Sequence, residues 1–469
     1  MKKAKIICTI GQTTNQQLIL KEMVDAGMDM VKLNLSEGSY SERQEIIKNI
    51  RDISKETGKH IGIIQEISGP RVRVGQLPSP VTLKEDFVFT LTTDEKATGD
   101  NIIPITYPNL PKEMHPGELI YFNEGQVSLK VIRTALSEII CKVIRGGEIQ
   151  SNEAMNLPMT KLKLPSLTDK DEEDIIFGIK TGVDMISLGS IRSAKDIHAI
   201  RLFLKKNRAD IPLIARIERA EAINHLDEII KASDGIMIVR QELAIEIPLE
   251  KLPLVQKGII AQASLLGKPV IIANGTLNSM LENPHPSMVE VTDIANAVFD
   301  LTDAFMLSEE TAIGKYPIEC IKTIIKIIKE AEASMEYEGI LRDRSELRKT
   351  SSHDALSYAV CQIATDLHVA AIISYTQTGA GVQQIIKYRP KAPIIALSPN
   401  QSVLRQMALY WDVLAMESDE LKNMDEIMNK GIETAKKSGL FRSGDRVIVA
   451  GSLPVNSIES TNFLQVVMV

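Results

Sequence analysis

Short apolar runs recur along the chain, and longer amphipathic segments separate them. Eight of these runs cover residues 4–10, 30–36, 60–66, 184–189, 212–216, 235–240, 269–274 and 304–308. Short runs that are apolar throughout are typical of parallel strands buried on both faces. Helical spacing covers residues 16–26, 41–57, 169–181, 253–266 and 317–333. The alternation predicts an α/β fold built on a TIM (β/α)8 barrel.

Two regions depart from this rhythm. From about residue 70 to residue 164, short runs of alternating apolar and polar residues lie among Pro, Gly and Asn, which predicts a small β-barrel domain inserted after the third strand. From residue 346, five strand-like runs alternate with helices and predict an open-sheet α/β domain. The predicted domains are residues 1–69 and 165–345 for the barrel, 70–164 for the insertion and 346–469 for the C-terminal domain.

Polar residues follow the carboxyl ends of the predicted barrel strands. They are Lys32, Asn34, Glu66, Arg216, Glu218, Arg240, Glu242, Asn274, Ser308 and Glu310. Enzymes with this fold place their active sites at that end of the barrel. A ligand site is therefore expected there, although an ion network that serves only stability gives the same pattern.

Composition and charge narrow the classes of function. The formal net charge of -7 and the pI of about 5.7 give no general attraction to nucleic acid or to an anionic membrane. Four cysteines lie far apart, without the spacing of a metal or redox site. We expect no secretory leader, because the first predicted strand follows Met1-Lys2-Lys3 directly and is too short for the apolar region of a signal peptide. We expect a cytoplasmic protein that binds a small molecule.

Two loops of the C-terminal region are rich in small hydroxylated residues. One contains Thr376, Thr378 and Gly379, and the other covers residues 457–462. Backbone amides in such loops can cradle phosphate, so the first loop is a candidate site for the phosphate of an effector. Ordinary turn chemistry explains the same composition.

A dozen segments, in the same order along the chain, resemble motifs of the pyruvate kinase family. They read KAKIICTIG, LNLSEG, SGPRVRVG, NLPKEMHPGELI, LPSLTDKDEEDI, ASDGIMIVR, EIPLEKLPLVQK, GKPVII, NPHP, DIANAVFD, TDAFMLSEETAIGKYP and KYRPKAPIIAL. The resemblance implies phosphoryl transfer between phosphoenolpyruvate and ADP. It also implies a divalent metal (Mg²⁺ or Mn²⁺), K⁺ as a monovalent cation, and a homotetramer or homodimer.

The resemblance assigns roles to the charged residues at the carboxyl ends of the predicted barrel strands, although several of them differ from the residues of the family. Glu218 and Glu242 correspond to the ligands of the divalent metal, and Glu242 stands where the family has aspartate. Arg216 stands where the family has its catalytic lysine. Arginine keeps the positive charge but does not exchange protons near neutral pH. Lys32 replaces an arginine that binds phosphate in the family. The bidentate hydrogen bonding of a guanidinium is thereby replaced by the single charge of an ammonium group.

The ligands of the monovalent cation are only partly retained. Asn34 and Ser36 match the family, whereas Glu66 replaces an aspartate. The neighbouring Ile67 replaces a threonine and offers no side-chain oxygen. Asn274 replaces a threonine that lies near the reacting carbon in the family.

Residues that bind the substrate carboxylate and the nucleotide in the family are also replaced in this sequence. Gln241 and Glu242 replace a Gly-Asp pair whose amides hold the carboxylate in the family. Arg73 matches an arginine on the nucleotide side. Residues 123–125 (Asn-Glu-Gly) replace Asp-Asp-Gly, and residues 152–153 (Asn-Glu) replace a basic pair. The loss of that basic pair is expected to weaken ADP binding.

Three functions fit these substitutions. The first is a pyruvate kinase of altered or reduced activity, since charge signs are kept at positions 32, 66, 216 and 242. The second is a related enzyme on the same barrel, which phosphorylates another hydroxylated acid or performs metal-enolate chemistry without nucleotide. The third is a non-catalytic ligand-binding or regulatory homologue.

Overall fold

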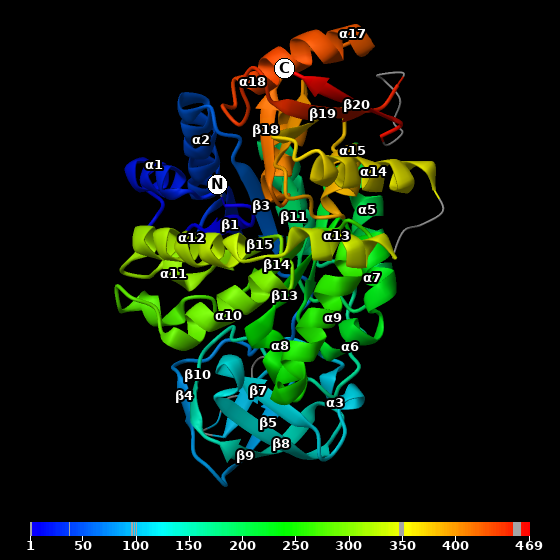
Figure 1. Ribbon diagram of the computed structural model, residues 1–469. Coiled ribbons are helices and arrows are strands. Elements are labelled where there is room, and N and C mark those ends of the chain that lie inside the picture. The colour runs from blue at the N-terminus through cyan, green and yellow to red at the C-terminus, as the bar shows by residue number, and fades with distance from the viewer. Residues whose placement is uncertain are drawn as a thin grey trace.

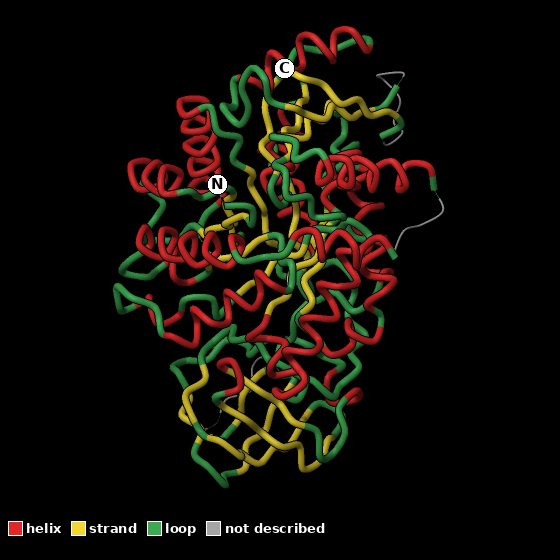
Figure 2. The backbone as a smooth tube through the Cα atoms, viewed as in Figure 1, coloured by secondary structure: helices red, strands yellow, loops and turns green. Residues whose placement is uncertain are grey.

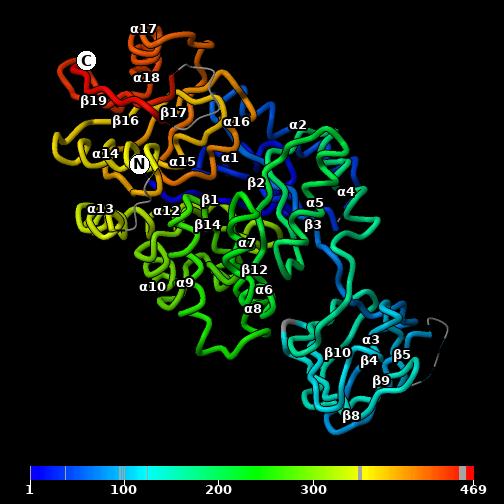
Figure 3. Tube along the Cα trace, turned by 90° about the vertical axis from the view of Figure 1, so that its right-hand side faces the viewer, coloured from blue at the N-terminus to red at the C-terminus, as the bar shows by residue number. Residues whose placement is uncertain are grey.

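The protein has three parts, which the computed structural model describes over residues 2–36, 38–94, 97, 99, 101–346, 351–453 and 461–469. A central barrel carries an all-β domain at one end and an α/β domain at the other (Figure 1). Figure 3, turned by 90°, shows the all-β domain projecting from the barrel on two connecting segments. Among the described residues, no helix combines the length and apolar character needed to cross a bilayer.

Eight parallel strands close into the barrel, so the predicted fold class is confirmed. Their order around the barrel is β1, β15, β14, β13, β12, β11, β3, β2. Their bounds are β1 (Lys5–Thr9), β2 (Met30–Asn34), β3 (Gly62–Ile67), β11 (Met185–Leu188), β12 (Leu213–Ile217), β13 (Gly235–Val239), β14 (Val270–Ala273) and β15 (Ala304–Leu307).

Helices surround these strands on the outside (Figure 2). They are α1 (Gln17–Ala26), α2 (Tyr40–Thr57), α4 (Asp169–Thr181), α5 (Ala194–Lys206), α6 (Ala220–Asn224), α7 (Leu226–Ala232), α8 (Arg240–Glu246), η2 (Leu249–Lys251), α9 (Leu252–Leu265), η3 (Asn278–Leu281), α10 (Met288–Phe299), α11 (Glu309–Ala312), α12 (Pro317–Ala333) and α13 (Tyr337–Ser345). Capping boxes begin α2 and α4: Ser39 pairs with Glu42, and Thr168 with Asp171. Each box satisfies amide groups that a helix start leaves free.

The inserted domain contains the strands predicted from alternation and two short strands that alternation missed. Its main sheet has the order β6, β5, β9, β8, β7, and a separate ribbon pairs β10 with β4. The missed strands are β6 and β10, each of three residues. The elements are β4 (Val81–Leu83), β5 (Val88–Thr92), β6 (Ile102–Pro104), α3 (Leu110–Glu113), β7 (Leu119–Phe122), η1 (Asn123–Gly125), β8 (Val127–Thr134), β9 (Glu138–Arg145) and β10 (Gly147–Ile149).

The C-terminal domain is a five-stranded mixed sheet with the order β18, β17, β16, β19, β20, in which only the pair β19 and β20 is antiparallel. Its elements are α14 (Ser352–Asp366), β16 (Ala371–Tyr375), α15 (Ala380–Ile386), β17 (Ile394–Ser398), α16 (Gln401–Gln406), η4 (Met407–Leu409), β18 (Val413–Glu417), α17 (Met424–Glu426), η5 (Ile427–Gly431), α18 (Ile432–Lys436), β19 (Arg446–Gly451) and β20 (Phe463–Met468).

The C-terminal domain closes the amino end of the barrel. Ala408 and Leu409 of η4 belong to the same buried cluster as the barrel-lining residues Met30, Met185 and Ala304, each of which begins its strand. This apolar plug keeps water out of that end. The opposite end, where the strands finish, carries the polar residues.

A buried ion pair fixes the C-terminal domain to the barrel. Nη1 of Arg389 lies 2.7 Å from Oδ1 of Asp303, and the two side chains are 2% and 4% exposed. Arg389 also donates to the carbonyl of Leu301, and its guanidinium stacks over the ring of Trp411. Oδ2 of Asp303 accepts from the amide of Val270 at the start of β14.

We predict that Arg389→Met destabilises the protein. Removing one partner of a buried pair leaves the other charge uncompensated, which costs about 3–5 kcal/mol. Thermal and urea unfolding measure the loss. Arg133→Met, at an exposed position of β8, is the control and is expected to change stability by no more than about 0.5 kcal/mol. Equal stability of the two variants would contradict this role of Arg389.

Candidate active site

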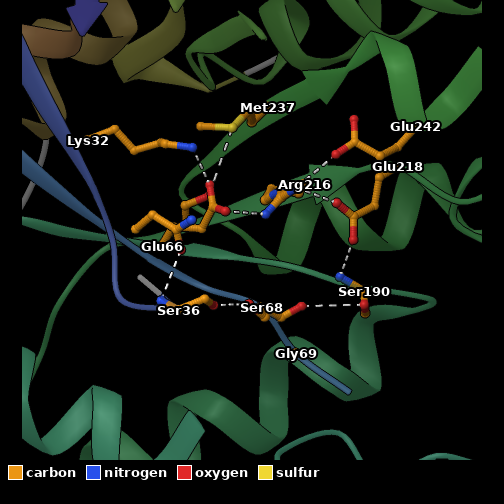
Figure 4. Close-up of polar contacts among 12 residues, drawn as sticks. Lys32, Ser36, Glu66, Ser68, Gly69, Ser190, Arg216, Glu218, Met237 and Glu242 are labelled. Atoms are coloured by element: carbon orange, nitrogen blue, oxygen red, sulfur yellow. Dashed lines mark hydrogen bonds and ion pairs between the residues drawn. The ribbon is translucent and has the colours of Figure 1, made fainter. Parts of the chain in front are cut away.

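Arg216, near the carboxyl end of β12, is at the centre of a buried ion cluster (Figure 4). Its Nη1 lies 2.9 Å from Oε1 of Glu66. Its Nη2 lies 2.7 Å from Oε2 of Glu218 and 3.6 Å from Oε1 of Glu242. The side chain is only 6% exposed. Burial disfavours the charge of Arg216, but Glu218 and Glu66 outweigh burial and raise its pKa. The guanidinium therefore stays charged.

Glu66, on β3, joins Arg216 to Lys32. Nζ of Lys32, on the neighbouring strand β2, lies 2.7 Å from Oε2 of Glu66. Burial alone would raise the pKa of Glu66, but Arg216 and Lys32 lower it to about 2. Each oxygen of this carboxylate thus faces a positive charge.

Glu218 is held by three donors or cations. Its Oε1 accepts from the amide of Ser190 at 2.6 Å and lies 3.0 Å from Nη2 of Arg71. Its Oε2 is close to Arg216 but lacks the angle for a hydrogen bond. Burial opposes its ionisation, and Arg216, Arg71 and the Ser190 amide outweigh burial and lower its pKa.

Ser190 reaches Glu218 because two glycines let the backbone segments after β3 and β11 pass close together. A Cβ on Gly69 would lie 2.4 Å from the carbonyl oxygen of Gly189, and a Cβ on Gly189 would lie 2.3 Å from that of Ser68. Any side chain at either position would push these segments apart. The glycines therefore fix the distance between the ends of the two strands.

Glu242 is the least compensated carboxylate of the cluster. It lies in the first turn of α8, and its Oε2 accepts from Nδ2 of Asn274 at 3.2 Å. The hydroxyl of Ser308 donates to Oδ1 of Asn274 at 2.7 Å, which orients the amide. Burial and the nearby charge of Glu218 raise the pKa of Glu242, although Arg216 opposes them. An additional cation beside Glu242 would relieve this penalty.

Glu218 and Glu242 are the two carboxylates that the family resemblance assigns to a divalent metal, and both lie beside Arg216. Oxygens of Glu218 and Glu242 lie 2.7 and 3.6 Å from the same nitrogen of Arg216, so they are at most about 6.3 Å apart. Mg²⁺ commonly uses one or two carboxylates and completes its shell with water or substrate oxygens. Among the described residues, no group of three or more His, Cys, Asp or Glu side chains forms a metal site made by the protein alone.

The donor set for a monovalent cation fits less well. Both oxygens of Glu66 face Lys32 or Arg216, and these charges repel a further cation. Oδ1 of Asn34 accepts from the amide of Ser36, and the Ser36 hydroxyl lies 2.7 Å from that of Ser68. Ile67 is buried and apolar. Among these side chains, Glu66 and Ile67 therefore offer little to a further cation.

The sequence analysis missed two members of the cluster. Arg71 and Ser190 lie in the segments that follow β3 and β11, and the sequence pattern predicted no role for either. Arg71 belongs to the motif SGPRVRVG, in which the family resemblance assigns a role to Arg73. A positive residue so close to the end of a barrel strand was the available signal. Ser190 acts through its backbone amide, which residue type does not reveal.

Arg73 and Gln241 are two further predicted site residues that lie outside the ion cluster. Arg73 donates from Nη1 to the backbone carbonyl of Asn152, at 2.9 Å, within the inserted domain. Gln241 follows Arg240 at the start of α8 and is half-buried. The carboxylate of Glu153 accepts from the amide of Asn123, which ties together the two altered turns of the insertion.

The loop containing Thr376 and Thr378 lies in the C-terminal domain, before α15. The Thr376 hydroxyl accepts from the amide of Gly379 at 2.9 Å, and the Thr378 hydroxyl from the amide of Ala380 at 3.4 Å. These bonds are those of a compact turn. Residues 457–460 of the other hydroxyl-rich loop lie outside the described residues. An effector phosphate at this loop stays a prediction.

Comparison with known proteins covers the whole chain. Residues 1–321 match the family model "Pyruvate kinase, barrel domain", and residues 354–467 match "Pyruvate kinase, alpha/beta domain". A pyruvate kinase of Geobacillus stearothermophilus is 39% identical over 99% of this chain and 80% of its own length. One of Clostridium acetobutylicum is 38% identical over the full length of both.

A comparison with solved structures agrees with these sequence similarities. The crystal structure of a pyruvate kinase from Cryptosporidium parvum superposes with a TM-score of 0.94 at 30% identity, covering 100% of this chain and 96% of that chain. With both domain models and full-length relatives in agreement, the chain belongs to the pyruvate kinase family.

Proposed function

We propose that this chain transfers a phosphoryl group between phosphoenolpyruvate and ADP, at a rate reduced by the substitution at position 216. The observation that carries the proposal is the contact of one guanidinium with Glu66, Glu218 and Glu242 at the barrel mouth. Phosphoryl transfer depends chiefly on positioning and on compensation of negative charge. This cluster keeps both cations and carboxylates where the family performs that reaction.

The proposed roles follow from the contacts. Glu218 and Glu242 would hold Mg²⁺, which compensates the charge of the phosphoryl oxygens when it is bound. Arg216 and Lys32 supply fixed positive charge for the phosphate of the substrate. Asn274, oriented by Ser308, holds Glu242 in place. Arg71 keeps Glu218 ionised, because it lies 3.0 Å from that carboxylate.

The reduced rate is expected because pyruvate formation requires a proton that Arg216 does not readily donate. The enolate left after transfer must receive a proton at carbon. Arg216 is a poor donor because Glu218 and Glu66 raise its already high pKa. Arg216 therefore cannot replace a lysine as the proton donor at this position.

A second function is favoured by the inserted domain. Arg73 donates a hydrogen bond from its guanidinium to the carbonyl of Asn152, which precedes the acidic Glu153. This arrangement offers little positive charge to a nucleotide phosphate. The second candidate is therefore phosphorylation of a different hydroxylated acid or metal-enolate chemistry without nucleotide, at the same Glu218 and Glu242.

We predict that Arg216→Lys raises kcat in a coupled assay with phosphoenolpyruvate, ADP and Mg²⁺. A positioned proton donor contributes about 10²- to 10⁴-fold in rate, so a rise of at least about tenfold is expected. Arg133→Lys, at an exposed site in the insertion, is the control. A folded Arg216→Lys protein with an unchanged or lower kcat would show that position 216 is not the main defect. Complete inactivity of both proteins would favour the second candidate or a non-catalytic homologue.

A second prediction concerns metal binding and pH. The raised pKa of Glu242 means that protons compete with metal at a higher pH than at an ordinary glutamate. Affinity for Mn²⁺ is therefore expected to fall as pH is lowered toward and through that pKa. Glu242→Gln should weaken Mn²⁺ binding about tenfold or more at pH 7.5 and flatten the pH dependence. Isothermal titration of both proteins measures this. Glu250→Gln, on the exposed η2, is the matched control.

A third prediction concerns monovalent cations. Because Lys32 and Arg216 already face Glu66, exchanging tetramethylammonium for K⁺ at constant ionic strength should change the rate less than about twofold. Initial rates over a K⁺ titration test this expectation. A saturable activation by K⁺ would show that Asn34, Ser36 and Glu66 form the ligand set that the family resemblance implies.

A further inference from the structure

A small cavity lies at the amino end of the barrel, where the barrel meets the C-terminal domain. It is lined by the end of α9, by residues that precede β14 and β15, by α13, and by the end of α15 and residues that follow it. The centre of a water-sized particle can lie within about 10 Å³ of this cavity, which is room for one such particle. Figures 1 and 3 both place α13 beside α14 of the C-terminal domain. An occupant would therefore contact the barrel, α13 and the C-terminal domain at once.

Three of the four cations that line the cavity already have partners. Arg389 forms the buried ion pair with Asp303, and Nζ of Lys387 lies 2.6 Å from Oδ1 of Asp354, with both side chains buried. Nζ of Lys268 donates to a backbone carbonyl at 2.8 Å, and burial lowers the pKa of this lysine. These three side chains are therefore not counted as free charge.

The fourth cation, Arg344 of α13, has no counter-charge. Its Nη1 donates to the carbonyl of Lys387. Among the described residues, no carboxylate forms an ion pair with Arg344, and its Nε and Nη2 donate to no acceptor. Burial lowers the pKa of Arg344 to about 9, and the nearby charge of Arg389 adds to this effect, so the guanidinium is still charged at neutral pH. A charge removed from water without a partner is costly. An anion beside Arg344 would relieve that cost.

Two further polar groups of the lining are buried without a partner. The hydroxyl of Ser264 and Nε of Arg389 have no hydrogen-bond partner in the part of the chain that the structure describes, and both residues are 2% exposed. Most buried polar groups in native proteins are hydrogen-bonded. Asp303, the one carboxylate among the described lining residues, is fully used, because its oxygens face Arg389 and the amide of Val270. The cavity thus offers unpaired donors and no free carboxylate, which favours an anion over a water molecule.

We propose that this cavity binds one small inorganic anion, of the size of chloride, between Arg344, Arg389 and Ser264. A phosphate or an organic acid needs more room than one water-sized particle occupies. The anion compensates the charge of Arg344 and connects α13 to the barrel and to the C-terminal domain. The site lies at the end of the barrel opposite to the candidate active site. The proposal does not depend on the proposed phosphoryl transfer, because its readouts are binding and stability.

Crystallography with bromide tests where the anion binds. Bromide substitutes for chloride and is located by its anomalous scattering. Crystals of the unaltered protein are grown with sodium gluconate as the salt, because gluconate is too large for the cavity, and are then soaked in sodium bromide. We expect an anomalous peak beside Arg344 in the unaltered protein and none there in Arg344→Met. Peaks at the surface alone would identify adventitious ions only and would overturn the proposal.

Thermal unfolding measures the same binding in solution, with chloride exchanged for gluconate at constant ionic strength. We expect Tm to rise with chloride and to saturate in the unaltered protein, because the anion binds the folded state. Arg342→Met, which removes an exposed arginine from the same helix, is the matched control and should keep this rise. Arg344→Met should lose it.

Ser264→Ala provides a second variant that leaves the charges in place. Removing a hydroxyl that donates to the anion should raise the chloride concentration for half of the effect at least about threefold. The same chloride dependence in the unaltered protein, Arg344→Met and Ser264→Ala would contradict the proposal. So would a Tm of the unaltered protein that does not respond to chloride.

Discussion

The candidate active site depends on one guanidinium surrounded by three carboxylates. Arg216 contacts Glu66, Glu218 and Glu242, while Lys32 and Arg71 add the remaining positive charges. Three cations thus balance three anions in a buried place where unpaired charge is costly. The balance is uneven, because the pKa of Glu66 falls to about 2 whereas that of Glu242 rises. That unevenness leaves Glu242 as the place where a metal ion would be most stabilising.

The rest of the fold holds this cluster in place. Parallel strands bring Lys32, Glu66 and Arg216 to one end of the barrel, and η1 of the insertion packs against α8, which carries Glu242. At the other end, η4 fills the barrel and Asp303 binds Arg389. Asp184 connects that end to the site region, since it precedes β11, whose following segment supplies the Ser190 amide. β11 therefore links Asp184, at the amino end of the barrel, to the segment that carries Ser190, at the carboxyl end.

The pattern of apolar and polar residues was sufficient to predict most of the fold. Strands buried on both faces are apolar throughout, so they are easily distinguished from the amphipathic helices between them. The pattern missed β6 and β10, which have three residues each and no longer alternating run around them. The positions of Lys32, Glu66, Arg216 and Glu242 followed from strand ends and family motifs. The ion pairs among these four residues could not be predicted, because the sequence does not show in which direction a long side chain extends. Arg71 and Ser190 were missed for the same reason: one extends from a connecting segment, and the other acts through its backbone.

The most direct test of the account is phosphorus NMR with enzyme and substrates in comparable amounts, which detects even a very slow transfer. Phosphoenolpyruvate, ADP and Mg²⁺ are incubated with the protein and with Glu218→Gln, whose lost carboxylate contacts both Arg216 and Arg71. We expect the γ-phosphate signal of ATP with the unaltered protein and its absence with Glu218→Gln. Failure to form ATP with the unaltered protein, or equal formation by both proteins, would contradict a phosphoryl-transfer site built on this ion cluster.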